Sequence, residues 1–292
     1  MNPRIPAAAA AVCGLCGLAA YAFSERLEIV HYTVKSRNAG GRTRFLHVSD
    51  LHGSDFGEEL YQRTDELSPD AVMMTGDIAD NRIPNEKAFA LTEYIGKRFP
   101  AFYVSGNHEI YTHDADGIKN RLRSQGITVL EGEGTMLTAG GSSFLICGID
   151  DPYGFPDRKG RLWEDQLSDC AALCRNGIFS VLLTHRPEMV KYYRETGFDL
   201  VLAGHAHGGQ VMIPGLLNGL YAPHQGLFPE YAGGKFNFPG SPCQTLIVSR
   251  GLSKYVRPRV FNRPELVVID IEPDNDAAVS YTHLRAHETD SY

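Results

Sequence analysis

Short apolar runs that each end in polar, ligand-type side chains constrain the fold of this chain more than any other feature. Such runs occur at residues 44–49, 71–75, 101–105, 179–183 and 198–203. Segments with helical spacing, 58–67 and 85–98, separate the first three runs. Strands that alternate with helices form parallel sheets, whose carboxyl ends gather the side chains that follow them. The pattern therefore predicts an α/β fold with a site along one sheet edge.

A second sheet is expected further along the chain. Short strands joined by glycine turns are indicated at 128–130, 134–138 and 143–148. The remaining expected elements are an edge strand at 27–34, helices at 116–125, 163–174 and 188–195, and closing strands at 245–249 and 266–271. Residues 214–239 are rich in Gly, Pro and aromatic residues, which predicts one long loop with a function or without order.

The polar residues at the strand ends are of the types that bind metals. They lie in six segments: Asp50-Leu51-His52, Gly76-Asp77, Gly106-Asn107-His108-Glu109, Thr184-His185, Gly204-His205 and Ala206-His207. Mixed oxygen and nitrogen ligands favour Mn, Fe or Zn over Ca. If Asp50 and His52 lie in extended backbone, they point the same way. One histidine at a strand end is more often structural, but six segments in this register indicate a metal site.

The order of these segments resembles the calcineurin-like metallophosphoesterase superfamily over residues 45–211. The runs 204–210, 249–252 and 262–265 resemble its membrane-associated bacterial phosphodiesterase branch, related to UDP-2,3-diacylglucosamine hydrolases. The resemblance implies an α/β (α+β) fold, a four-layer α-β-β-α sandwich of two mixed β-sheets flanked by helices.

The resemblance also implies a set of site residues and two divalent metal ions (Mn, Fe or Zn). One ion would be held by Asp50, His52, Asp77 and His207, and the other by Asp77, Asn107, His185 and His205. Asp77 would bridge the two ions. His108 would be the catalytic histidine, and Asp80 would orient it.

The expected activity is hydrolysis of a phosphate ester by metal-bound hydroxide, since two metals lower the pKa of bound water toward about 7. His108 would protonate the leaving oxygen or stabilise charge there. The expected enzyme is a phosphodiesterase or pyrophosphatase acting on a phosphoester small molecule or on a lipid-linked or nucleotide-lipid substrate. The alternatives are a cell-wall or teichoic-acid-type phosphodiesterase, a general phosphomonoesterase or protein phosphatase, and a non-catalytic metal-binding scaffold of the same fold.

Three domain segments are predicted: an N-terminal membrane anchor or signal segment at 1–26, a metallophosphoesterase domain at 27–276, and a non-native or disordered tail at 277–292. Residues 5–23 carry no charge, which suits a membrane anchor, a signal cleaved near Ala20-Tyr21-Ala22, or a buried helix. The expected location is the bacterial cell membrane, with the soluble domain on the extracytoplasmic side. The net charge of −7 and the lack of a basic block in the body of the chain argue against nucleic acid as a partner.

Several weaker candidates have two interpretations each. Arg250 or Arg263 could contact a phosphate, and Arg186-Pro187-Glu188 could simply begin a helix. Aromatic residues of the long loop could form an apolar wall for a lipid or nucleoside, or only pack the loop: Tyr221, Phe228, Tyr231 and Phe236. Glu109 is expected to tune the site or cap a segment, whereas His47 and His113 are expected to be structural or surface residues.

Overall fold

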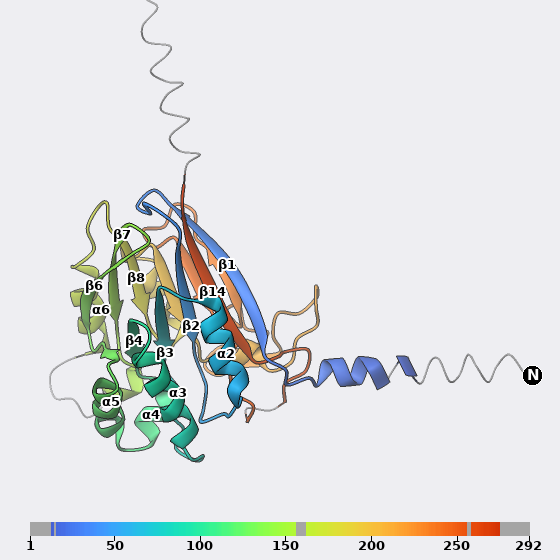
Figure 1. The fold of residues 1–292 in the computed structure, drawn as a ribbon. Helices are drawn as coiled ribbons and strands as arrows, with labels where there is room; N and C mark the ends of the chain where they lie inside the picture. The colour runs from blue at the N-terminus through green and yellow to red at the C-terminus, as the bar shows by residue number, and fades with distance from the viewer. Residues whose placement is uncertain (1–12, 15, 156–161, 256–257, 275–292) are drawn as a thin grey trace, which may run out of the picture.

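Four layers make up the domain. The computed structural model describes residues 13–14, 16–155, 162–255 and 258–274. Two six-stranded sheets pack face to face, and helices cover the outer face of each sheet (Figure 1). The predicted α-β-β-α sandwich of two mixed sheets is therefore confirmed.

The first sheet is parallel except at one pairing. Its order is β1 (Glu28–Ser36), β14 (Glu265–Pro273), β2 (Thr43–Val48), β3 (Ala71–Thr75), β4 (Ala101–Val104) and β5 (Thr128–Val129). Strand β14 is parallel to β1 but antiparallel to β2, and it lies between them in Figure 1. The carboxyl ends of β2, β3 and β4 consequently meet at one edge of the sheet.

The second sheet has four parallel strands with an antiparallel strand at each edge. Its order is β12 (Gly234–Asn237), β13 (Thr245–Val248), β9 (Leu200–Ala203), β8 (Phe179–Leu183), β7 (Ser142–Gly148) and β6 (Glu133–Ala139). Residues 214–239 are not one loop, because they contain β12 and the hairpin β10 (Tyr221–Ala222) to β11 (Gly226–Leu227). These strands are too short to show a period in the sequence.

Helices divide between the two outer faces. Helices α2 (Glu58–Leu67), α3 (Glu86–Gly96) and α5 (Ala115–Ser124) pack on the first sheet, and α6 (Trp163–Ala171) and α7 (Val190–Tyr193) pack on the second. The shorter pieces are α4 (Asn107–Tyr111) and the 3₁₀ turns η1 (Pro152–Gly154), η2 (Pro187–Met189) and η3 (His207–Gly209). The predicted helix at 188–195 is wrong in extent, since Pro187 begins a 3₁₀ turn and only four residues continue as α-helix.

Burial on both faces explains why the strands are continuous apolar runs. Successive side chains of a strand point to opposite faces, and both faces of each sheet are covered here. Phe45 packs between the sheets against Phe144, with ring centroids 5.1 Å apart. Its neighbour Leu46 faces the helical layer of α2 and α3. Fully burying such a side chain stabilises the fold by about 1.5–3 kcal/mol.

The N-terminal segment extends from the domain as a helix at residues 16–22, with most of its side chains exposed (Figure 1). It contacts the domain where the Tyr21 ring packs on Phe261 and the Phe261 N–H donates to the Ala22 carbonyl. In the part of the chain that the structure describes, no helix has the length and apolar character to cross a bilayer. Residues 1–12 and 275–292 lie outside the described residues, so the three domain boundaries remain predictions.

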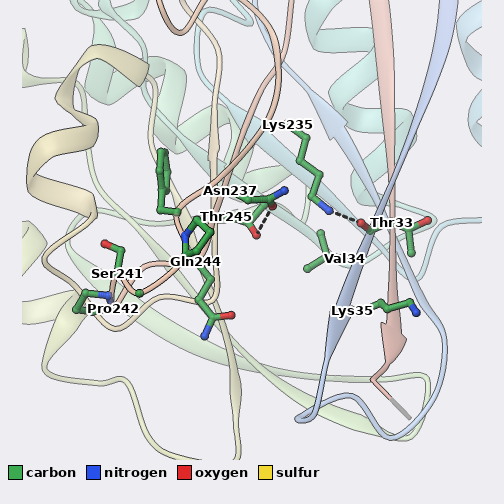
Figure 2. A pocket seen from close by; sticks show the side chains of 12 residues that line it. Thr33, Val34, Lys35, Lys235, Asn237, Ser241, Pro242, Gln244 and Thr245 are labelled. Atoms are coloured by element: carbon green, nitrogen blue, oxygen red, sulfur yellow. Dashed lines mark hydrogen bonds between the residues drawn. The ribbon is translucent and has the colours of Figure 1, made fainter. Parts of the chain in front are cut away.

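A cavity of about 870 Å³ opens between the end of β1 and the segment that joins β12 to β13 (Figure 2). Lys235 crosses it and donates to the Thr33 carbonyl at 2.6 Å. Thr245, on its wall, pairs with Leu200 at the amino-terminal ends of β13 and β9. The cavity therefore lies at the sheet edge opposite the strand ends that carry the metal-binding residue types.

Candidate metal centre

The ends of five parallel strands place the candidate ligands at one edge of the sandwich. Asp50 and His52 follow β2, Asp77 follows β3, and Asn107 follows β4 in the first sheet. In the second sheet His185 follows β8, whereas His205 and His207 follow β9. All seven side chains are buried. Two sheets thus supply one shared cluster, which we call the carboxyl edge.

The backbone at this edge is strained. Left-handed φ angles between 47° and 66° occur at five of the candidate ligands: Asp50, His52, Asp77, His205 and His207. Such angles are uncommon for residues other than glycine, and each costs on the order of 1 kcal/mol or more. Asp50 and His52 do not lie in extended backbone, so the predicted reason for their proximity is wrong. A sharp left-handed turn brings them together instead.

The candidate ligands form two neighbouring groups, and Asp77 lies between them. Ligand atoms of Asp50, His52 and His207 lie within 4.8 Å of one another, and so do those of Asp77, His185 and His205. The Asp77 Oδ2 atom is 3.2 Å from His185 Nε2 and 3.6 Å from His52 Nε2. One carboxylate oxygen therefore faces both groups.

Several buried polar atoms of the cluster have no hydrogen-bond partner among the described residues: His52 Nε2, Asp77 Oδ2, Asn107 Oδ1 and His207 Nδ1. A buried polar atom without a partner costs about 1–3 kcal/mol. Divalent metals bind carboxylate and amide oxygens and imidazole nitrogens. The donor set and its unpartnered atoms therefore fit a metal site.

Neighbouring groups fix how two imidazoles point. The Nδ1 atom of His185 lies 2.7 Å from the Thr75 carbonyl, which can only accept a hydrogen bond. The Nδ1 atom of His52 lies 2.8 Å from Asp80 Oδ2. In both rings Nδ1 therefore carries a proton, and the Nε2 atom is directed toward Asp77 in the cluster. Metal-binding histidines commonly have such partners.

Charge balance in the cluster rests on Asp77. Burial disfavours its ionised form, but His185 beside it outweighs that effect and holds the pKa of Asp77 well below its usual range. Burial would likewise lower the pKa of His185, yet Asp77 raises it to about 10. Burial lowers the pKa of His205 and His207 well below the usual value. Those two rings are neutral, which is the form that binds metals.

Glycines allow the strand ends to approach one another. A Cβ atom on Gly106 would lie 2.3 Å from Asp77 Oδ1, and one on Gly204 would lie 2.3 Å from Asp50 Oδ2. Neither position has room for a side chain. Gly106 and Gly204 therefore leave the room that a crowded centre needs.

The sequence pattern described as calcineurin-like phosphoesterase matches residues 43–209, more than half of the chain. The chain belongs to the calcineurin-like phosphoesterase family. As a member of this metallophosphoesterase family it is a hydrolase acting on phosphoric ester bonds, and the family uses divalent metals. The match covers every candidate ligand described above.

Curated relatives resemble this phosphoesterase over most of its length. The uncharacterized metallophosphoesterase YkuE of Bacillus subtilis is 28% identical, covering 94% of this chain and 96% of the relative. An uncharacterized metallophosphoesterase of Aquifex aeolicus is 30% identical, covering 87% of this chain and 96% of the relative. The phosphodiesterase YaeI of Escherichia coli is 27% identical, covering 78% of this chain and 82% of the relative.

His108 of this phosphoesterase stands beside the metal cluster and is partly exposed. Its Nδ1 atom lies 3.0 Å from Asp80 Oδ2, the oxygen that also contacts His52, and 3.1 Å from Asn81 Oδ1. Its backbone N–H donates to Asp77 Oδ1 at 2.7 Å. One oxygen of Asp80 therefore contacts both imidazoles, through the Nδ1 atom of each ring.

Glu109 acts through the backbone. Its buried carboxylate accepts hydrogen bonds from the N–H groups of Asp77, Ala79 and Gly106, all at 2.9 Å. Burial, reinforced by the charge of Asp77, raises the pKa of Glu109. These bonds fix the turns after β3 and β4, in agreement with its expected capping role.

A second layer of polar residues contains Arg186, which the sequence suggested only as a helix start, together with Asp151 and His224, which the sequence did not single out. Buried Arg186 is held by Asp151 through two contacts of 2.5 and 3.1 Å. Its Nη1 atom lies 2.8 Å from His224 Nδ1, and His224 Nδ1 lies 3.2 Å from His205 Nε2. Arg186 directly follows His185, and Asp151 lies just after β7. Polar residues that follow buried strands are expected at the site, so both could have been predicted as site residues. His224 is on the β10–β11 hairpin, and no apolar run in the sequence predicted a strand there.

The weaker candidates mostly serve other contacts. Arg250 pairs with Glu265 and Glu28, and Arg263 lies over the Tyr21 ring. Tyr231 packs on Phe236, which favours loop packing for these two rings. The two other rings of the proposed wall, Tyr221 and Phe228, are exposed. His47 is a buried residue that contacts Thr75 and His113 is exposed, so the structural and surface roles expected for them are confirmed.

Proposed function

We propose that this hydrolase is a phosphodiesterase or pyrophosphatase with two divalent ions, Mn, Fe or Zn. The observation that carries the proposal is the position of Asp77 Oδ2, which faces His185 in one ligand group and His52 in the other. Asp50, His52, Asp77 and His207 would hold one ion. Asp77, Asn107, His185 and His205 would hold the second, with Asp77 as the bridge.

The two ions, when bound, would activate water and offset negative charge on the phosphate. The oxygen of water forms a bond to phosphorus, and the bond from phosphorus to the leaving oxygen breaks. His108 gives a proton from Nε2 to that leaving oxygen, while a proton of the water passes to solvent. Asp80 supports this step because its contact with Nδ1 stabilises the protonated ring and fixes its direction.

Apart from the proposed ions, the side chains add little unpaired positive charge at the site, which favours a diester over a monoester. Arg186, whose Nη1 atom lies 3.1 Å from His205 Nε2, is already paired with Asp151 and lies 3.4 Å from Glu188. A doubly charged monoester end would gain little from a guanidinium that is neutralised in this way. The relative YaeI is named as a phosphodiesterase, which points in the same direction.

We also propose a membrane-attached protein whose residues 1–26 form the attachment, with the enzyme domain outside the cytoplasm and a lipid-linked substrate. Support comes from the uncharged run 5–23 and from the exposed apolar side chains Leu18, Tyr21 and Phe23 on its described part. Exposed apolar residues in one segment are typical of contact with lipid or protein.

Hydrolysis of bis-p-nitrophenyl phosphate and p-nitrophenyl phosphate by the full chain tests the proposed reaction. Each substrate is assayed with and without Mn, beside a His108→Ala variant and with metal content measured in every sample. Cleavage that depends on Mn, is faster on the diester and is lost in the variant is the expected result. Faster cleavage of the monoester would favour a general phosphomonoesterase. A protein that binds metal but cleaves neither substrate would favour a metal-binding scaffold.

A further inference from the structure

A row of aromatic rings borders the site from His108 to His205. Ring centroids are 5.7 Å apart between His108 and Tyr111, 5.8 Å between Tyr111 and Tyr153, and 5.8 Å between Tyr153 and His224. His224 then stacks on His205 at 5.4 Å. The row, which we call the aromatic arc, comes from four segments that are far apart in sequence: α4, η1, the turn after β9 and the β10–β11 hairpin.

The middle of the arc is open to solvent. The exposed fractions are 41% for Tyr111, 42% for Tyr153 and 42% for the side chain of His224. At each end, by contrast, the arc meets a residue of the proposed centre: the proposed acid His108 and the proposed ligand His205. A molecule whose phosphate lies at the centre would therefore have the arc beside it.

The exposed rings are fixed rather than free. The Tyr153 hydroxyl lies 3.0 Å from His224 Nε2, and the Arg186 guanidinium lies 4.7 Å from the centre of the Tyr153 ring. Since Arg186 can only donate, His224 Nδ1 accepts, and the ring proton sits on Nε2 and points to Tyr153. His224 also has a left-handed φ of 62°, a strained conformation that the surrounding contacts must maintain.

We propose that the aromatic arc is a binding surface for a planar aromatic ring of the substrate, such as a nucleobase or an aryl group attached to the phosphate. The inference rests on the proposed phosphodiesterase function and adds the class of group that flanks the phosphate. Aromatic rings stack on planar π systems whatever their substituents, and rigid platforms lose little entropy when they bind. An ordered row of rings suits a planar ring better than a flexible acyl chain.

The first test compares two phosphomonoesters that differ only by the base. Adenosine 5′-monophosphate and ribose 5-phosphate are titrated by calorimetry into the full chain loaded with Mn. Both place a phosphate at the centre, but only the nucleotide can stack. We expect the nucleotide to bind roughly tenfold more tightly. In a Tyr111→Leu, Tyr153→Leu double variant the two affinities should become equal, while ribose 5-phosphate binds as in the wild type.

Tyr94→Leu is the matched control, because Tyr94 is a tyrosine of α3 that packs on Tyr61, outside the arc. It should leave the difference between the two ligands unchanged. A second measurement uses hydrolysis of bis-p-nitrophenyl phosphate and methyl p-nitrophenyl phosphate, which release the same phenolate. The preference for the aryl diester should fall in the double variant and persist in the control.

The outcomes separate this inference from the proposed function. Equal affinities of the wild type for both ligands would overturn the aromatic subsite and leave the phosphodiesterase proposal standing. The same conclusion follows if the nucleotide preference persists in the double variant. If neither ligand binds the metal-loaded protein and no diester is cleaved, the proposed function fails and the subsite fails with it.

Discussion

The two edges of the sandwich differ in packing: one edge holds an open cavity, and the other is filled with buried polar side chains. At the amino-terminal ends of β9 and β13 there is a cavity of about 870 Å³. The described residues that line it include two lysines but no histidine or carboxylate. The carboxyl edge instead packs seven candidate ligands below the surface, with left-handed backbone at five of them.

The difference shows that the cavity and the candidate metal ligands lie at opposite edges of this fold. Parallel strands deliver the residues that follow them to one edge, and left-handed turns point those residues inward. Backbone strain and unpartnered polar atoms destabilise the fold, so they persist where binding of a ligand offsets their free-energy cost. The proposed metal binding and catalysis belong to the carboxyl edge, and the predictions below test that difference between the two edges.

Asp77→Asn should have the broadest effect, because it should lower metal content and turnover together. The substitution keeps the shape of the side chain but removes the charge that faces both ligand groups. We expect loss of bound metal and a fall in diester hydrolysis of about 100-fold or more. Metal content by mass spectrometry and turnover would be measured together. Asp55→Asn, at an exposed carboxylate beside Lys87, is the matched control. Retention of both ions and full turnover in Asp77→Asn would refute the bridging role.

His108→Ala should separate catalysis from metal binding. Since His108 contacts Asp80 through Nδ1 and is only proposed to transfer a proton, its removal should leave metal content unchanged. The expected fall in kcat is about 10²–10⁴-fold. His113→Ala removes an exposed histidine just after α4 and should change neither quantity. Loss of metal from His108→Ala would make it a ligand instead of an acid.

The sequence was sufficient for the layers and for most of the carboxyl edge. Buried strands of five residues, such as β3 and β8, have unmistakable apolar runs, and their ends mark Asp77 and His185. The sequence did not reveal the aromatic arc, because its exposed rings come from α4, η1 and a hairpin whose strands have two residues each. Such short elements have no period of their own. Their positions depend on tertiary contacts, among them the bond from Arg186 to His224.

A histidine close to the carboxyl edge is not always a candidate ligand, and His47 in β2 is an example. Burial lowers the pKa of His47 to about 3, against about 6.5 in an unfolded chain. As pH falls through this window, the unfolded chain takes up a proton that folded His47 does not. The free energy of unfolding should therefore decrease as pH falls from about 6.5 toward 3, by on the order of 5 kcal/mol in all.

His47→Gln tests this contribution, because glutamine can still contact Thr75 but does not titrate. Urea unfolding of both proteins at about pH 7 and about pH 4.5 measures the pH dependence of stability. We expect a smaller loss of stability in the variant at the lower pH, with activity at neutral pH close to wild type. An identical pH dependence in the two proteins would show that His47 is protonated in the folded state.

Lys235→Met should have the smallest effect, although it alters the wall of the cavity at the opposite edge. Burial lowers the pKa of Lys235, and its ammonium group donates to the Thr33 carbonyl. Methionine keeps the length of the side chain and loses one partly exposed hydrogen bond. The free energy of unfolding should change by no more than about 1 kcal/mol, and metal content and kcat should stay the same. A clear fall in kcat with intact stability would couple the cavity to the metal centre, because nothing else in the substitution reaches the carboxyl edge.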